Sequence, residues 1–110
     1  MAASPISDQI ISHVSLIFGS LGDTSRLKLL RTLLEAGEPL CQGKLAELTG
    51  LSQANASKHL ALLVQVGLVL REQQGNLVFF KPVEPIVEEL CDLVCGHVKA
   101  RIENAYHAMK

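Results

Sequence analysis

The chain has 110 residues, of which 48% are hydrophobic and 19% charged, and its formal net charge is −1. This length fits one domain, and the hydrophobic content excludes wholesale disorder and allows a core of aliphatic side chains, since aromatic residues make up only 4%. No apolar run approaches the roughly 18 residues that cross a bilayer, and the first residues lack the basic start and long apolar segment of a secretory signal, so we expect a cytoplasmic protein. The three cysteines are odd in number, which favours free thiols over a disulfide framework.

Two helices are predicted at the start of the chain. Ser4 and Pro5 are typical of a helix start, and the isoleucine-rich segment that follows has helical periodicity up to a pair of glycines, Gly19 and Gly22. A second helix with a stripe of leucines is expected from a cap at residue 23 or 24.

A helix-turn-helix is predicted in the middle of the chain. Residues 40–48 form a short helix with Leu45 and Leu48 inward, and residues 49–51 form a turn that contains a glycine. Residues 52–66 form the second helix of the pair, with Ser52 as its cap and small or aliphatic residues on its buried side.

A hairpin and a long helix complete the chain. Residues 68–82 predict a wing of two strands about a turn at 73–76, and residues 86–108 predict a helix with one apolar side. The expected fold is mainly α, in the order α-α-α-α-β-β-α, and is a single winged helix-turn-helix domain over residues 1–110. The first and last helices are apolar enough to need a partner, so we expect dimerisation through them; the alternative is that they pack on their own domain.

The start of helix 52–66 carries the side chains that a DNA-reading helix needs. Gln53 and Asn55 can each present a donor and an acceptor together, which suits adenine, and Ser57 can donate or accept. Lys58 can reach a phosphate or a guanine, and Ala54 is small enough to allow close approach. The alternative is an ordinary polar helix start.

The wing supplies further candidates for DNA contact. Arg71 is its strong cation, and Asn76 lies at the expected hairpin tip. Basic residues outnumber acidic ones from Arg26 to Lys81, whereas the reverse holds from Pro82 to Lys110, a distribution that suits phosphate contact by the centre of the chain.

Three segments together resemble the ArsR/SmtB family of bacterial winged-helix repressors. They are Leu21-Gly22-Asp23-Thr24-Ser25-Arg26-Leu27, the segment from Leu51-Ser52-Gln53 to Ser57-Lys58-His59-Leu60, and Gly67-Leu68-Val69 before the Arg71 wing. The resemblance implies a homodimer on a short, roughly palindromic DNA operator, with repression relieved by an inducer. By position it implies DNA contact by Gln53, Ala54, Ser57, Lys58 and Arg71, whereas His59 either joins them or lies beneath its helix.

The sequence does not identify the inducer. The family's metal motifs are not intact here: the third helix has one cysteine, Cys41, and Cys95-Gly96-His97 lacks the aspartate of the zinc-type members. Cys91 and Cys95 are four apart and share a helix face. With Cys41 they are candidates for a soft metal or arsenite, or for oxidation or persulfidation; alternatively, Cys91 and Cys95 are small hydrophobic residues of the dimer interface.

Two other classes of function compete with a repressor. A winged helix can be a protein-interaction module that never touches DNA, which the slightly acidic net charge would suit. A thiol enzyme is disfavoured, because no nucleophile has a base near it in sequence and neither Cys-x-x-Cys nor a phosphate-binding glycine loop is present. We therefore expect no catalytic activity.

Overall fold

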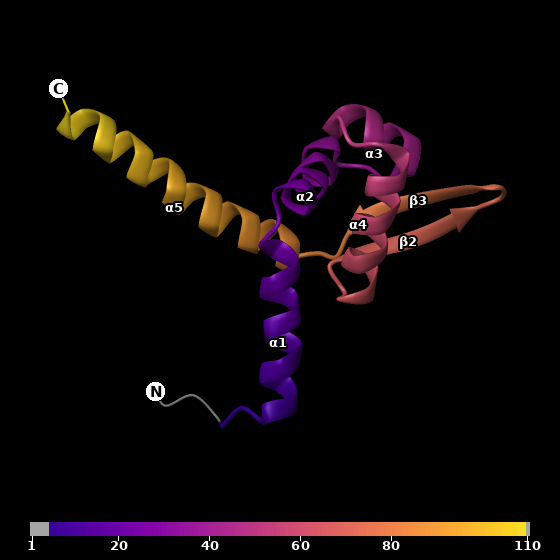
Figure 1. Cartoon of the computed structure of the whole chain (residues 1–110), viewed down its shortest axis with the longest axis horizontal. Helices are drawn as coiled ribbons and strands as arrows, with labels where there is room; N and C mark the ends of the chain where they lie inside the picture. Colours follow the sequence, from indigo (N-terminus) through magenta and orange to yellow (C-terminus); the bar gives the residue numbers. More distant parts are fainter. Residues whose placement is uncertain (1–4, 110) are drawn as a thin grey trace.

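The computed structural model describes residues 5–109, which form five helices and three strands (Figure 1). In chain order these elements are α1 (Asp8–Leu21), α2 (Thr24–Ala36), β1 (Leu40–Cys41), α3 (Gln42–Thr49), α4 (Gln53–Gln65), β2 (Val69–Gln74), β3 (Leu77–Pro82) and α5 (Ile86–Ala108). The mainly helical fold with a hairpin wing is confirmed.

Side-chain caps fix the starts of three helices. The Oγ of Ser7 accepts from the Ile10 amide at 3.2 Å, and Ser52 caps α4 through the Asn55 amide at 3.1 Å. Asp23 caps α2, as one of the two expected candidates. The helix start expected at Ser4 falls outside the described residues, and α1 begins later than the Pro5 signal indicated.

The expected start of the third helix is wrong, because Leu40 and Cys41 form a short strand. They pair antiparallel with Phe80 and Phe79 of β3, so their backbone hydrogen bonds are made to a segment far along the chain. The expectation for Leu48 is also wrong: its exposure is 52%, because α2 and α4 cover the side of α3 that carries Leu45 and Ala46.

The three-stranded antiparallel sheet has the order β1-β3-β2. Strands β2 and β3 form the wing, and their pairing reaches Gln74 opposite Leu77, so the turn is two residues long and not four. Gly75 in that turn has a φ of 64°, which a glycine adopts without strain. The Nζ of Lys81 lies 2.6 Å from a Glu72 carboxylate oxygen across the two strands.

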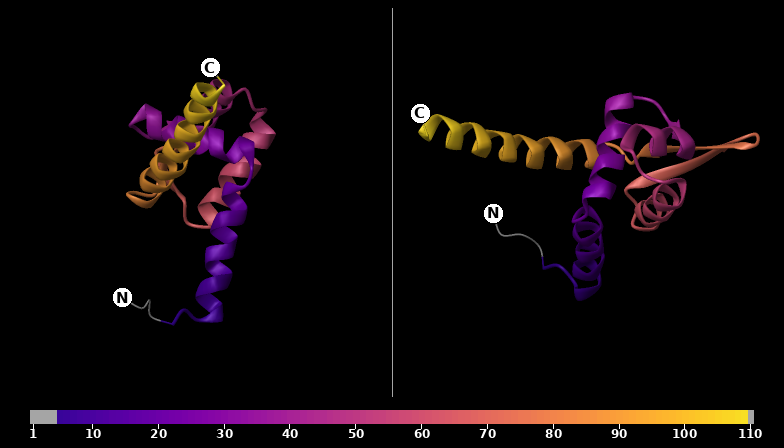
Figure 2. Two further views of the ribbon diagram at one scale, coloured as in Figure 1. Left: turned by 90° about the vertical axis from the view of Figure 1, so that its left-hand side faces the viewer. Right: turned by 45° about the horizontal axis from the view of Figure 1, so that its top comes forward.

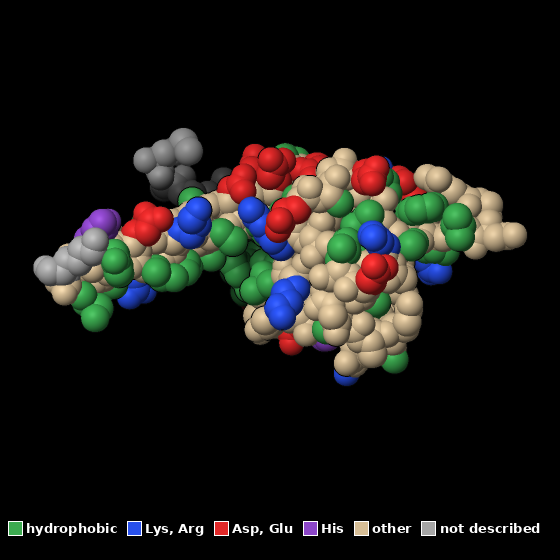
Figure 3. All heavy atoms as spheres, turned by 90° about the horizontal axis from the view of Figure 1, so that it is seen from above, with side chains coloured by type: hydrophobic (Ala, Val, Ile, Leu, Met, Phe, Trp, Pro, Cys, Tyr) green, Lys and Arg blue, Asp and Glu red, His purple; other side chains and the backbone are tan. Residues whose placement is uncertain are grey.

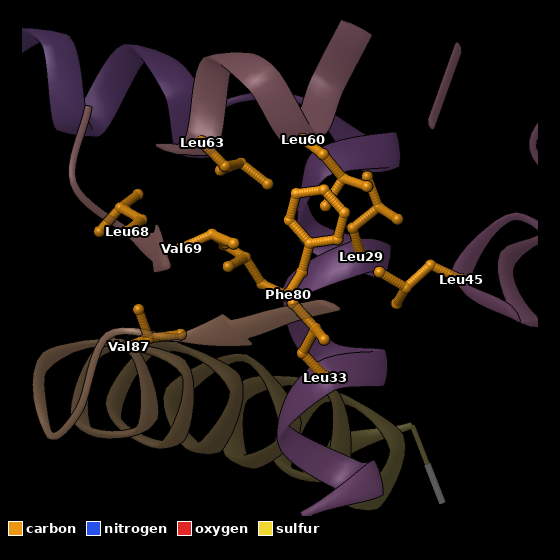
Figure 4. Packing of buried hydrophobic residues seen from close by; sticks show 10 residues of the cluster. Leu29, Leu33, Leu45, Leu60, Leu63, Leu68, Val69, Phe80 and Val87 are labelled. Atoms are coloured by element: carbon orange, nitrogen blue, oxygen red, sulfur yellow. The ribbon is translucent and has the colours of Figure 1, made fainter. Parts of the chain in front are cut away.

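A single hydrophobic cluster joins α2, α3, α4 and the sheet (Figure 4). Phe80 lies between the leucines of α4 and those of α2, and Val87 brings the first turn of α5 onto the same cluster. We call α2, α3, α4 and the sheet the body. Burial of each large aliphatic side chain in such a core contributes about 1.5–3 kcal/mol, so the body has its own source of stability.

Helices α1 and α5 project from the body as two arms, on the side away from the wing tip (Figures 1 and 2). Their apolar side chains are largely exposed, and Figure 3 shows them along α5 and in the angle between α5 and the body. Examples are Phe18 at 63%, Leu93 at 73% and Ile102 at 64% exposure. Within one chain the arms do not bury these residues on their own domain. No helix in residues 5–109 has the length and apolar content to span a membrane.

Candidate nucleic-acid interface

Helices α3 and α4 are joined by a tight turn that fixes how α4 is presented. Gly50 has a φ of 77°, and its N–H donates to the Ala46 carbonyl at 2.9 Å. Ala56, Leu60 and Leu63 anchor one side of α4 in the core, as the sequence predicted. The opposite side of the helix is therefore directed away from the body.

Of the polar residues that the sequence proposed on α4, all but His59 are exposed. Gln53, Ala54, Asn55, Ser57 and Lys58 are exposed. Lys58 makes no ion pair with any residue in 5–109, so its ammonium is available to an external anion. This side offers two carboxamides, a hydroxyl and a cation within the first two turns of one helix.

Gln53 is held by a residue that the sequence analysis did not single out. The Nε2 of Gln42, at the start of α3, donates to the Gln53 side-chain oxygen at 3.2 Å and to its backbone oxygen at 3.3 Å. The only signal in the sequence was a polar side chain at the first position of the short helix. Its partner is eleven residues away, and only the angle between the two helices brings them together.

His59 faces the junction between α1 and α2 and does not extend with its neighbours on α4. Its Nδ1 lies 3.3 Å from an Arg26 nitrogen, and its side chain is 16% exposed. The structure thus places His59 beneath its helix, the second of the two alternatives that the sequence left.

Arg26 joins the last turn of α1 to α2 and α4. Its guanidinium donates to the Ser20 and Gly19 carbonyls, and its backbone N–H donates to the Asp23 carboxylate at 3.0 Å. The bond from the Arg26 N–H, as the main cause, lowers the pKa of Asp23 below its ordinary value, and the nearby guanidinium adds to the effect.

The wing faces α4 across a shallow groove. Arg71 on β2 lines it together with Ser57 and Gln42, and Leu60 and Phe80 are among the apolar residues at its base. Arg71 is exposed and forms no ion pair within residues 5–109, whereas Asn76 lies at the wing tip. The groove therefore joins a cation of the wing to the polar side of α4.

The three cysteines lie on different parts of the molecule and are free thiols. Cys41 belongs to β1, Cys91 packs partly against the core, and Cys95 is exposed on α5. Burial, and then the proximity of Cys95, raises the pKa of the Cys91 thiol. Within residues 5–109, no three His, Cys, Asp or Glu side chains are placed to hold one metal ion.

Comparison with known proteins converges on one kind of regulator. A family model described as bacterial regulatory protein, arsR family, matches residues 23–70. A Staphylococcus aureus cadmium resistance transcriptional regulatory protein CadC homolog is 31% identical over 96 residues, which cover 87% of this chain and 78% of that protein. The Escherichia coli arsenical resistance operon repressor is 40% identical over 65 residues, or 59% of this chain and 55% of that protein.

A similar structure has also been solved. The homodimeric winged helix-turn-helix DNA-binding domain of a Mycobacterium bovis protein superposes with a TM-score of 0.80 at 24% identity, covering 93% of this chain and 95% of that one. At this identity the likeness supports the fold.

Proposed function

Because the chain belongs to the ArsR family of bacterial regulatory proteins, we propose that it is a homodimeric DNA-binding transcriptional repressor that contacts its operator through α4 and the wing. Members of this family are regulators and not enzymes, in line with the expectation from the sequence. The comparisons give no support to the alternative of a protein-interaction module.

The observation that carries the proposal is the exposed polar side of α4 beside Arg71. A helix whose first turns offer amide, hydroxyl and ammonium groups has the donors and acceptors that base edges in the major groove require. Arg71 lies across the groove from Ser57, where it would meet a phosphate or the minor groove. In a dimer the two copies of α4 would enter major grooves about one helical turn apart.

Selection from a pool of randomised duplexes tests the proposal. We expect the purified dimer to enrich a roughly palindromic sequence and to bind it with an affinity that falls steeply as salt rises, because neutralised phosphates release counterions. A pool from which no sequence is enriched, with no binding at low salt, would contradict the proposal and favour the interaction module.

Two substitutions separate base recognition from phosphate contact. Ser57→Ala should weaken the free energy of binding to the selected duplex by about 1–3 kcal/mol, and that of binding to a random duplex by much less. Lys58→Ala should weaken binding to both duplexes alike, and should lower the slope of log affinity against log salt concentration by about one. Ser12→Ala on α1 and Lys99→Ala on α5 are matched controls, since both residues are exposed on the arms. Equal losses for Ser57→Ala on both duplexes would remove it from base recognition.

We propose that any thiol-dependent release from DNA acts at Cys91 and Cys95 on α5. Two of the family's regulators named above are cadmium and arsenical resistance proteins, and thiolates are the ligands that such soft ions prefer. One chain supplies no third ligand among its described residues, so a third donor would come from the partner subunit or from solution.

Native mass spectrometry after exposure to cadmium, arsenite or polysulfide tests this part of the proposal. We expect an adduct on the dimer that is lost in Cys91→Ser and Cys95→Ser and kept in Cys41→Ser, together with loss of DNA binding on addition of the same reagent. Release that persists in the Cys91→Ser and Cys95→Ser variants would assign the response elsewhere.

A further inference from the structure

We propose that Arg26 and His59 are positioning residues that fix the spacing of the two DNA half-sites which the dimer accepts. They hold α4 at a set angle to α1, one of the two arms expected to meet the second subunit. The inference rests on the proposed function, because half-site spacing matters only if two copies of α4 enter the same duplex. It gives His59 a part in the choice of operator, although its side chain lies beneath α4.

The guanidinium of Arg26 closes the end of α1. Two residues, 22 and 23, separate α1 from α2, so a short turn sets the angle between these helices. The last carbonyls of a helix have no partner within the helix. Arg26, on α2, supplies donors to two of them: its Nε donates to the carbonyl of the buried Ser20, and its Nη2 donates to the Gly19 carbonyl at 3.5 Å. The direction of α1 is thereby tied to one side chain of α2.

The third nitrogen of the same guanidinium meets α4. Its Nη1 lies 3.3 Å from the Nδ1 of His59, and because a guanidinium can only donate, Nδ1 is the acceptor. The Asp23 carboxylate lies 4.0 Å from this Nδ1, too far for a hydrogen bond. On α4, His59 lies between the exposed Lys58 and the buried Leu60. One side chain, Arg26, therefore links the end of α1 to the helix proposed to read DNA.

The angle at this junction decides how far apart a dimer presents its two copies of α4. Helix α1 has 14 residues, so it is roughly 20 Å long. A tilt of roughly 10° between α1 and the body moves the body by about 3.5 Å over that length, close to the rise of about 3.4 Å for one base pair. A junction held to a few degrees can therefore distinguish operators whose half-site spacing differs by one base pair. At the other arm, Arg31 and Asp92 form an exposed pair at 3.9 Å, which restrains direction less.

The test compares the selected duplex with two derivatives, in which one base pair is inserted or removed between the half-sites. The wild-type dimer should bind the derivatives about tenfold or more weakly, because one half-site is displaced. His59→Ala should reduce this spacing ratio about threefold or more, whereas His59→Asn should keep it, since its side-chain oxygen can accept near the Nδ1 position. Arg26→Lys keeps the charge but loses the fork of donors, so it should relax the ratio as His59→Ala does. The double variant should go no further than either alone.

The outcomes separate this inference from the function on which it rests. Lys58→Ala should weaken binding to all three duplexes alike, and Arg31→Ala is the matched control at the other arm; both should leave the spacing ratio unchanged. A wild-type dimer indifferent to spacing, or an equal loss on all three duplexes in His59→Ala, overturns the inference and leaves the function standing. An unchanged ratio in Arg26→Lys also overturns it, even if His59→Ala does not fold. Failure to select any duplex overturns both.

Discussion

The body and the arms are built from similar aliphatic residues but place them differently. In the body, leucines of α2, α3 and α4 are fully buried around Phe80. In the arms, isoleucine, leucine, valine and phenylalanine side chains of α1 and α5 remain largely exposed (Figure 3). Exposed apolar surface of this extent marks an interaction site, and a homodimer is the partner that the family implies.

The difference assigns separate tasks to the two regions. The body is stabilised by its own contacts and presents α4 and the wing, whereas the arms depend on a second chain. Only the nearest turns of the arms touch the body: Val87 and Cys91 pack α5 on the core, Ile17 and Leu21 pack the end of α1 on it, and Arg26 ties α1 to α4. The same substitution should therefore have different consequences in the two regions.

The largest expected effect is a leucine deletion in the body. Leu63→Ala, at a position with 0% exposure, should lower the free energy of unfolding by about 2–5 kcal/mol at every protein concentration, since it leaves a cavity. Leu93→Ala makes the same chemical change on an arm at 73% exposure, and its effect should depend on concentration. Urea unfolding at several concentrations measures both. A concentration-independent loss of equal size in Leu93→Ala would contradict the division.

A charge on an arm should break the dimer and spare the body. Phe18→Asp buries a carboxylate in the apolar interface and should weaken dimerisation by about 10- to 100-fold or more, the range of interface hot spots. Leu16→Asp is the matched control, because two residues turn the helix by roughly 200° and place Leu16 on the other side of α1. Analytical ultracentrifugation gives the dimer affinity, and circular dichroism shows whether the body stays folded. Equal weakening by both variants would contradict an interface on the side of α1 that carries Phe18.

Most elements of the fold were predictable from the sequence because their signals are local. Ser52 as cap, the buried spacing of Ala56, Leu60 and Leu63, and the whole of α5 follow from caps and periodicity within one segment. β1 was missed because its partner strand, β3, lies about forty residues further along the chain. Leu40 gives no local sign of that pairing.

The candidate site, too, was predictable only where its signals lie within one helix. The exposed candidates on α4 follow from helical spacing, once the buried side is known. The Gln42 amide on Gln53 and the Arg26 guanidinium beside His59 depend on angles between helices that the sequence does not express. Whether each proposed residue meets a base is decided by DNA, and stays a prediction.

A smaller effect is expected where the arms join the body. Arg26→Ala removes donors to α1 carbonyls and the contact with His59. It should lower the free energy of unfolding by about 1–3 kcal/mol, because partly buried acceptors lose their partner. Arg31→Ala is the matched control at the other arm: Arg31 pairs with Glu35 and Asp92 through exposed groups, worth about 0–1 kcal/mol. Chemical denaturation measures both, and a larger loss for Arg31→Ala would reverse the ranking.

The smallest effect is a dependence on pH at the two junctions, with opposite signs. The pKa of Asp23 is lowered by the Arg26 N–H, so its contribution to stability is present above its ordinary value of 3.8 and is lost as the pH falls through the lower value in the folded state. The pKa of Glu84, before α5, is raised by desolvation and by Glu88, so its contribution is present below its ordinary value of 4.5 and is lost as the pH rises through the higher folded value. Thermal unfolding across this acid range should show a shallower loss of stability toward low pH for Asp23→Asn than for the wild type, and a steeper one for Glu84→Gln. Identical profiles for all three proteins would mean that neither carboxyl senses the junction between arm and body.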